Sequence, residues 1–192
     1  MVGSILLQVV CGVLVANFLE WVIHKYILHV WAKNKNSPFS SHWHQHHNIV
    51  RKTGGFDESY KSLWNSWSEG TKELFALFLL TLLQIPTFFY LPVYASTTIV
   101  MSAAYYLVHR KSHLDPEWSR VHLSWHYDHH MGPNQDANWC VTFPLFDYIL
   151  GTRVKYVGTD RERADIAKRS AKELSRVGVS EGSNIGGAVR SQ

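Results

Sequence analysis

Long apolar runs alternate along the chain with stretches that carry all of its charges. Residues 1–19 contain no Asp, Glu, Lys or Arg, and neither do residues 74–108. Because a bilayer core about 30 Å thick needs roughly 20 helical residues, the first run predicts one membrane span over residues 4–23. The run has no basic start and continues directly into the stretch "LEWVIHKYILH". We therefore expect a retained span and not a cleaved signal peptide.

The second apolar run predicts a tight hairpin of two short spans. The spans are expected over residues 74–90 and 92–108, with the bend near Pro86 and Pro92, since proline disrupts a helix interior. With helix expected in both apolar runs, the predicted fold class is all-α: an integral membrane protein with about three spans.

The basic residues predict the orientation of these spans. All 19 Lys and Arg residues lie in residues 25–72 or 110–192, on one side of the expected spans. The positive-inside tendency makes that side cytoplasmic and places the N-terminus outside. The sequence pI near 9.1 then indicates positive charge that lies at the membrane surface. No nucleic-acid partner is expected, because no recognisable binding motif accompanies the charge.

The chain divides into a membrane domain, residues 1–160, and a C-terminal segment, residues 161–192. The second segment is expected to hold an amphipathic helix and a flexible tail. The apolar stripe of that helix consists of Ile166, Ser170, Leu174 and Val177. Cys11 and Cys140 are far apart in sequence, so they indicate neither a disulfide framework nor a paired-cysteine metal site.

Histidines follow each expected span and form the strongest chemical signal. All 12 fall into four clusters, all on the expected cytoplasmic side. The clusters are His24 and His29; His42, His44, His46 and His47; His109 and His113; and His122, His126, His129 and His130. Such density at four matching places predicts a histidine-rich helical cap that binds metal.

The spacing within two clusters makes different predictions. His109 and His113 are four residues apart, so on a helix both can face one ion. His24 and His29 are five apart, which is about 140° around a straight α-helix. Those two converge only if the helix bends or ends there, or if they serve different ions.

The remaining clusters favour two ions. His129 and His130 diverge by about 100° on a helix and can reach different metals, with His126 between them. The second cluster is ambiguous, because either His42 or His44 can complete a set with the pair that follows. At least nine histidines are available, more than one ion accepts, so we expect two metals. Imidazole alone does not select among iron, zinc, copper and nickel.

The clusters resemble the HX3–4H, HX2–3HH and HX2–3HH signature of the membrane-bound fatty acid hydroxylase and sterol desaturase superfamily. The chain is most similar to fatty acid 2-hydroxylases. The stretch "LEWVIHKYILH" looks like the motif at the end of a span in those enzymes, and "VHRKSH" is similar to their HX3H motif. The stretch "HYDHH" matches their last HX2HH motif, and "NWCVTFPLFDYILGT" looks like the segment that follows it. The resemblance covers residues 18–155.

The resemblance implies a cytoplasmic cap with a non-haem centre of two iron ions and O2 as co-substrate. Zinc can replace iron in isolated protein. The implied ligands are His24, His29, His42, His46, His47, His109, His113, His126, His129 and His130. His44 is an alternative ligand, whereas His122, Glu20 and Asp128 are candidates to hold ligands in place. Asp147 is expected to organise the cap.

The leading functional hypothesis is O2-dependent hydroxylation of a lipid acyl or alkyl chain. A lipid or sterol desaturase with the same centre is the alternative. A metal transporter or a binding scaffold is an alternative of another class, although residues 74–108 lack the histidine or carboxylate expected of a midplane transport site. Electrons are expected from a separate donor of ferredoxin or cytochrome b5 type. The expected location is the bacterial inner membrane, or the endoplasmic reticulum in a eukaryote.

Overall fold

The computed structural model describes residues 2–62 and 68–186 and divides the chain into two compact units, Met1–Lys155 and Tyr156–Gln192. Every regular element among the described residues is a helix, so the predicted all-α class is confirmed for them. The first unit contains α1 (Val2–Val22), η1 (Ile23–Trp31), η2 (His42–His46), α2 (His47–Lys52), η3 (Glu58–Tyr60), α3 (Glu69–Leu82), α4 (Ile85–Tyr90), α5 (Pro92–Leu114), α6 (Pro116–His122), α7 (Ser124–Met131) and α8 (Leu145–Ile149).

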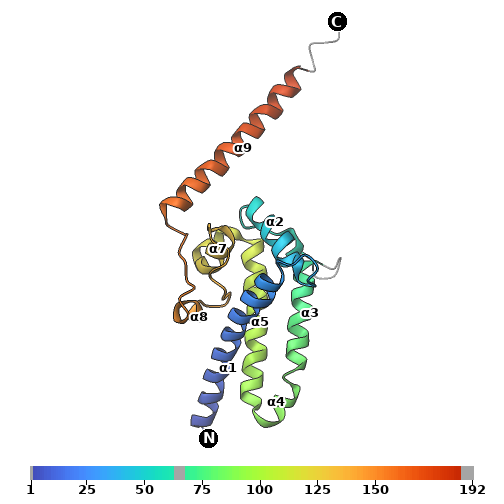
Figure 1. The fold of residues 1–192 in the computed structure, drawn as a ribbon, viewed down its shortest axis with the longest axis vertical. Coiled ribbons are helices and arrows are strands. Elements are labelled where there is room, and N and C mark those ends of the chain that lie inside the picture. Colours follow the sequence, from blue (N-terminus) through green and yellow to red (C-terminus); the bar gives the residue numbers. More distant parts are fainter. Residues whose placement is uncertain (1, 63–67, 187–192) are drawn as a thin grey trace. The chain divides into compact units, whose positions relative to one another are not determined.

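Helix α5 is the axis of the first unit. Helices α1 and α3 each pack along α5, and the short α4 joins α3 to α5 at one end (Figure 1). Helices α2 and α7 lie at the opposite end (Figure 1). The histidines at the ends of α1 and α5 are therefore brought to the end of the unit that α2 and α7 occupy.

The hairpin differs from the sequence prediction in its first arm. Residues 74–90 were expected to form one span, but α3 ends at Leu82 and α4 begins only at Ile85. Pro86 lies in the first turn of α4, where its missing N–H is tolerated, and Pro92 begins α5 in the same way. The prolines thus start new helices at the tip instead of bending a continuous one.

One helical segment among the described residues is long and apolar enough to cross a membrane. It runs from Gly3 to Trp31, is 29 residues long and contains the predicted first span. Helices α3 and α4 have 14 and 6 residues and are too short for the same criterion. Helix α5 is longer, but Ser, Thr and Tyr side chains lower its hydropathy.

The second unit consists chiefly of α9 (Asp160–Gly186). Its first turn is closed by Glu162, whose carboxylate accepts the backbone N–H of Gly158 at 2.7 Å. The helix includes the predicted amphipathic stripe and extends into the expected tail, of which residues 187–192 lie outside the described residues.

Gly12 should be needed for the close packing of α1 on α5. A Cβ at Gly12 would lie 2.8 Å from the Cβ of Thr97 and 3.2 Å from the carbonyl oxygen of Tyr94. We expect Gly12→Ala to destabilise the protein by about 1–3 kcal/mol through overpacking. Thermal unfolding of the purified protein in detergent measures this. Gly3→Ala is the control, because a Cβ there meets nothing within 4 Å; an equal or smaller loss in Gly12→Ala would contradict the prediction.

Candidate metal centre

Ten of the twelve histidines are buried together in the first unit. They are His24, His29, His42, His46, His47, His109, His113, His126, His129 and His130. They come from η1, from η2 with the start of α2, from the end of α5 and from α7. The structure thus brings together every residue that the resemblance implied as a ligand.

The first cluster converges because its helix changes winding. Residues Ile23–Trp31 form a π-helix, in which each hydrogen bond spans five residues; the N–H of Ala32 bonds the carbonyl of Ile27 at 3.2 Å. Side chains five apart then lie one turn apart on the same face. The ring centroids of His24 and His29 are accordingly 5.1 Å apart. The two rings therefore converge because the segment departs from straight α-helix geometry, which was the condition stated for their convergence.

Two histidines of the second cluster also converge through a π-helical turn. Residues His42–His46 are also π-helical, and His42 and His47, five apart, have ring centroids 5.0 Å apart. The ring of His46 lies against a different histidine, with its centroid 4.5 Å from the ring centroid of His113. His44 is not among the ten buried histidines, and its Nε2 is 3.1 Å from the carbonyl oxygen of Lys33. The geometry therefore includes His42 and not His44.

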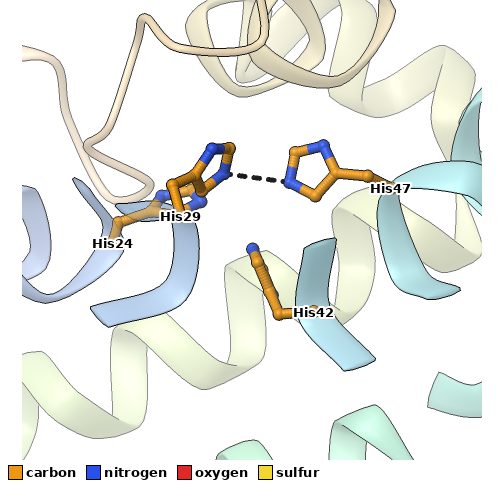
Figure 2. Close-up of side chains that lie close together, drawn as sticks. All are labelled: His24, His29, His42 and His47. Carbon is orange, nitrogen blue, oxygen red and sulfur yellow. Dashed lines mark hydrogen bonds between the residues drawn. The ribbon is translucent and has the colours of Figure 1, made fainter. Parts of the chain in front are cut away.

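The buried histidines form two linked groups. In each group one ligand nitrogen per residue lies within 4.8 Å of all the others. Group 1 contains His24, His29, His42 and His47, which point toward a common space from two sides (Figure 2). Group 2 contains His46, His109, His113 and His130. His129 meets His47 and His130 in a third set that joins the groups, and the Nε2 of His126 lies 3.3 Å from that of His113.

The outer nitrogens of these rings are held by fixed acceptors. Nδ1 of His24 and of His129 lies 2.7 Å from the carbonyl oxygens of Trp139 and Ala137. Nδ1 of His113 lies 3.2 Å from the carbonyl oxygen of Gly55. An acceptor at this position requires the N–H to be on Nδ1. The lone pair is therefore on Nε2, which is the arrangement of a metal ligand.

The inner nitrogens lack suitable partners within the protein. Nε2 of His24, His42 and His46 is buried without a hydrogen bond. Nε2 atoms also face one another at 3.1 Å in the pairs His29–His47 and His109–His113. Buried polar atoms are normally satisfied. Opposed lone pairs of neutral imidazoles fit metal ions between them, so the residues present suit a histidine-bound metal centre.

Burial also keeps these rings in the form that binds metal. Loss of hydration lowers the pKa of His126, His129 and His130 well below the usual value, and repulsion by neighbouring imidazolium charges adds to it. Burial likewise lowers the pKa of His113 to about 3. These side chains are neutral at pH 7, and no proton must be displaced for a metal to bind.

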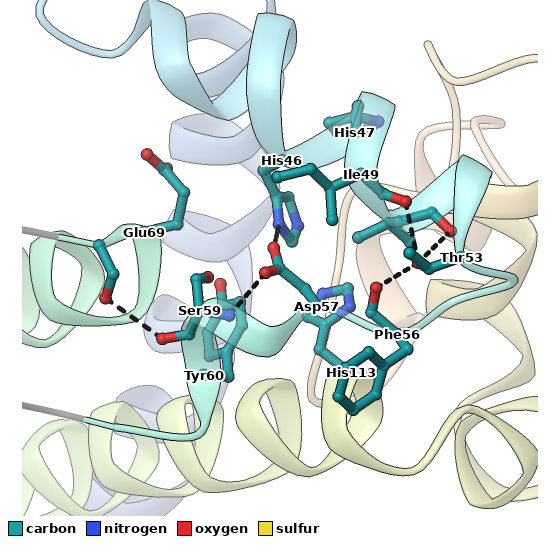
Figure 3. A network of polar contacts seen from close by, with 12 residues as sticks. His46, His47, Ile49, Thr53, Phe56, Asp57, Ser59, Tyr60, Glu69 and His113 are labelled. Carbon is teal, nitrogen blue, oxygen red and sulfur yellow. Dashed lines mark hydrogen bonds and ion pairs between the residues drawn. The ribbon is translucent and has the colours of Figure 1, made fainter.

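Asp57 holds His46 and was not identified from the sequence. Its Oδ2 lies 2.7 Å from Nδ1 of His46, and its Oδ1 accepts the N–H of Ser59 at 2.9 Å (Figure 3). Burial raises the pKa of this carboxyl group, but the bonds from His46 and Ser59 outweigh it and bring the pKa to about 2. Asp57 therefore stays ionised and keeps the proton of His46 on Nδ1.

Glu73 holds His109 in the same manner and was also missed. Its Oε2 lies 2.7 Å from Nδ1 of His109 and accepts the hydroxyl of Tyr60 at 2.7 Å. The ring of Tyr60 stacks on His113 with centroids 5.1 Å apart. One signal was present in the sequence: Glu73 is the last charged residue before the uncharged run, where an ionised group is costly.

Glu20 and Asp147 position the loop that supplies the carbonyl acceptors. Asp147 accepts the N–H groups of Trp139 and Cys140 at 2.8 and 2.9 Å, which fits its expected role in organising the cap. Glu20 accepts the N–H of Val141 and of Thr142 at 3.0 Å each. Glu20 was a candidate to bind a ligand histidine directly. Its carboxylate instead holds the loop whose carbonyl oxygen contacts His24.

Two further candidates have the partners that follow. Asp128 is fully buried and forms an ion pair with Arg153 at 2.6 Å. His122 is exposed, and its Nδ1 lies 3.0 Å from the carbonyl oxygen of Trp118.

An apolar cavity of about 420 Å³ reaches the histidines. Its walls come from α1, η1, α3 and α5 and include Leu19, Ile23, Leu77, Leu80 and Met101. His24, His42 and His109 line it, so both groups are accessible from the cavity. Polar side chains line it as well: Ser41, Tyr60, Glu69, Lys72 and Glu73.

Comparison with known families gives one match. A family model described as fatty acid hydroxylase matches residues 9–152, which is most of the chain. No curated protein and no solved structure matches the chain.

The positions of His42 and His44 yield a matched pair of variants. We expect His42→Ala to lower the metal content of the purified protein, because it removes an inward Nε2 from group 1. His44→Ala should leave metal content unchanged, because His44 contacts a backbone carbonyl outside the groups. Elemental analysis of both variants, with circular dichroism to confirm folding, measures this. Equal metal content in the two variants would refute the assignment of His42.

Proposed function

We propose that this chain, which belongs to the fatty acid hydroxylase family, is an O2-dependent oxidoreductase that hydroxylates a lipid acyl or alkyl chain at a centre of two iron ions. One observation carries the proposal above the others. An apolar cavity of about 420 Å³ is lined by His24 and His42 of group 1 and by His109 of group 2. An alkyl chain in that cavity lies against both groups at once.

Two ions are supported by the number and arrangement of the histidines. Each group offers four nitrogens, His129 lies where the groups meet, and His126 lies against His113 of group 2. Histidine sets of this size suit iron, although zinc binds such ligands more tightly and can replace it in isolated protein. Bound iron with O2 supplies the oxidising power that an unactivated C–H bond requires. The net reaction consumes the C–H bond, O2, two electrons and two protons, and yields an alcohol and water.

The residues of this chain would orient the substrate. Leu77, Leu80 and Met101 exclude water from the alkyl chain. Ser41 and Lys72, joined by a 2.9 Å hydrogen bond, line the cavity together with His42 and suit a polar head group. Tyr94 also lines the cavity, 15 residues before His109 on α5, or about 22 Å along the helix. With the head group near Lys72, the part of the cavity that extends to Tyr94 holds the alkyl tail. The carbons next to the head group then lie nearest the histidines, so oxidation is expected close to the head group.

We propose three membrane passes, formed by α1 and by the hairpin, with the histidines on the cytoplasmic side. Support comes from the outward surfaces: Leu6 of α1 is 63% exposed, Phe89 of α4 is 79% exposed and Val100 of α5 is 65% exposed. Large apolar side chains exposed on all three helices suit lipid contact.

Cysteine labelling tests this topology. In a background with Cys11 and Cys140 replaced by alanine, we expect a cysteine at Pro92 to react with an impermeant reagent from outside. A cysteine at Ser180 should react only after the membrane is permeabilised. The reverse pattern would overturn the proposed orientation.

Hydroxylation is favoured over desaturation by the motifs similar to fatty acid 2-hydroxylases, "LEWVIHKYILH" and the segment after "HYDHH". Both motifs have a structural role. The first forms the π-helical turn, and the second forms the loop that holds His24 and His129.

Isotope labelling tests the reaction. Purified protein loaded with ferrous iron and given 18O2, a reductant and a lipid extract should give a lipid with one labelled oxygen on a carbon near its polar group. His113→Ala should give none, and His44→Ala should match the unaltered chain. An alkene as the sole oxygen-dependent product would favour the desaturase alternative. No oxygen-dependent product from any lipid class would contradict the proposed function.

A further inference from the structure

The proposed reaction needs two electrons per turnover, and these must reach histidines that are almost fully buried. An electron donor protein cannot enter the apolar cavity, so its redox group must approach another face of the centre. Such a face is identified by a side chain that reaches the surface and is also in close contact with a ligand histidine.

Trp43 provides a contact of this kind. Its side chain is partly exposed, and its ring lies 4.9 Å from the ring of His29 and 5.4 Å from that of His47, both in group 1. On the surface side, Nζ of Lys33 lies over the same indole at 4.6 Å. One aromatic side chain thus connects solvent-exposed charge to two histidines.

Hydrogen bonds connect the segment around Trp43 with two stretches that carry exposed basic residues. Nε2 of His44 contacts the carbonyl oxygen of Lys33, and the carbonyl oxygen of His44 accepts the side-chain amide of Asn48 at 2.7 Å. On α2, Asn48 is one turn before Arg51 and Lys52, both exposed. We call this the Trp43 surface; its cations are Lys33, Lys35, Arg51 and Lys52.

The Trp43 surface has little neutralising charge. Asp136 contributes a carboxylate, whose two oxygens accept bonds from Lys33 at 2.7 Å and whose Oδ1 also lies 3.4 Å from Nδ1 of His29. Nη1 of Arg51 donates hydrogen bonds to the carbonyl oxygens of His130 and Gly132, and the guanidinium group keeps its full charge. Four cations against one carboxylate attract an acidic protein surface and raise its rate of encounter.

We propose that the Trp43 surface is the docking site of an acidic one-electron donor protein that carries an iron–sulfur or b-type haem group, and that Trp43 is the point of electron entry. This inference rests on the proposed function. Each donor molecule is oxidised by one electron, and two successive dockings supply the two electrons that accompany O2 reduction. Trp43 acts here as a positioning residue, which holds a short contact between the donor and group 1.

Binding and electron transfer are measured separately to test this. The probes are an acidic [2Fe–2S] ferredoxin and the soluble domain of cytochrome b5, each mixed with iron-loaded protein in nanodiscs of neutral lipid. We expect Lys35→Glu with Lys52→Glu to weaken binding of the preferred donor by about tenfold and to reduce its salt dependence. Lys111→Glu is the control, because Lys111 is an exposed cation on α5 that pairs with Asp115.

Trp43→Leu should slow oxidation of the pre-reduced donor in stopped flow without weakening its binding, and Trp43→Phe should restore part of the rate. Metal content of every variant should equal that of the unaltered chain. Equal effects of the Lys35/Lys52 and Lys111 changes, or no binding of either donor to the unaltered chain, would overturn the proposal. So would a Lys35/Lys52 variant that loses binding to anionic vesicles while its donor affinity is unchanged, because the surface would then face lipid.

A chemical reductant separates this proposal from the proposed function. Dithionite-reduced protein given 18O2 bypasses the donor, so the Lys35/Lys52 and Trp43 variants should still form labelled product. If the unaltered chain forms no product under these conditions, the proposed function fails, whatever the binding measurements show.

Discussion

The structure depends on a repeated hydrogen bond between the outer nitrogen of a buried histidine and a fixed acceptor. The carbonyl oxygens of Trp139 and Ala137 and the carboxylates of Asp57 and Glu73 each occupy the Nδ1 side of one ring. This arrangement leaves the Nε2 lone pair facing inward and fixes the orientation of the ring. Ten buried imidazoles would otherwise be costly to pack, since several inner nitrogens lack partners and others face one another. Bound metal removes that cost, so we expect folding and metal binding to be coupled.

The helices serve this arrangement by bringing distant segments to one end of the unit. Helix α5 carries His109 and His113 and also forms the surface against which α1 and α3 pack. The close contact at Gly12 sets how near α1 lies to α5. The same three helices enclose the cavity, so one packing arrangement determines both where the histidines meet and what can approach them.

Much of this could be predicted from the sequence, and the failures have physical causes. Apolar runs predicted helices and the histidine clusters predicted a metal-binding cap, because both are local patterns, whereas the ten residues that converge were implied by the family resemblance. The π-helical turns were missed, since 3.6 residues per turn was assumed where histidines five apart require a wider turn. Asp57, a loop residue, bonds the ring of His46 from 11 residues further along the chain, and nothing local distinguishes it from Glu58. Glu20 was recognised as unusual, but its partners are backbone groups over 120 residues away, which no local pattern reveals.

The long-range contacts of His24 also set an order of assembly during synthesis. Its acceptor, the carbonyl oxygen of Trp139, lies 115 residues later in the chain. The histidines of group 1 are therefore synthesised long before this acceptor exists. Until the last loop emerges, those imidazoles face water or any passing metal. A nascent chain of this protein is thus open to an ion before the site is complete, and the metal supply of the cell during translation would influence which ion the finished protein holds.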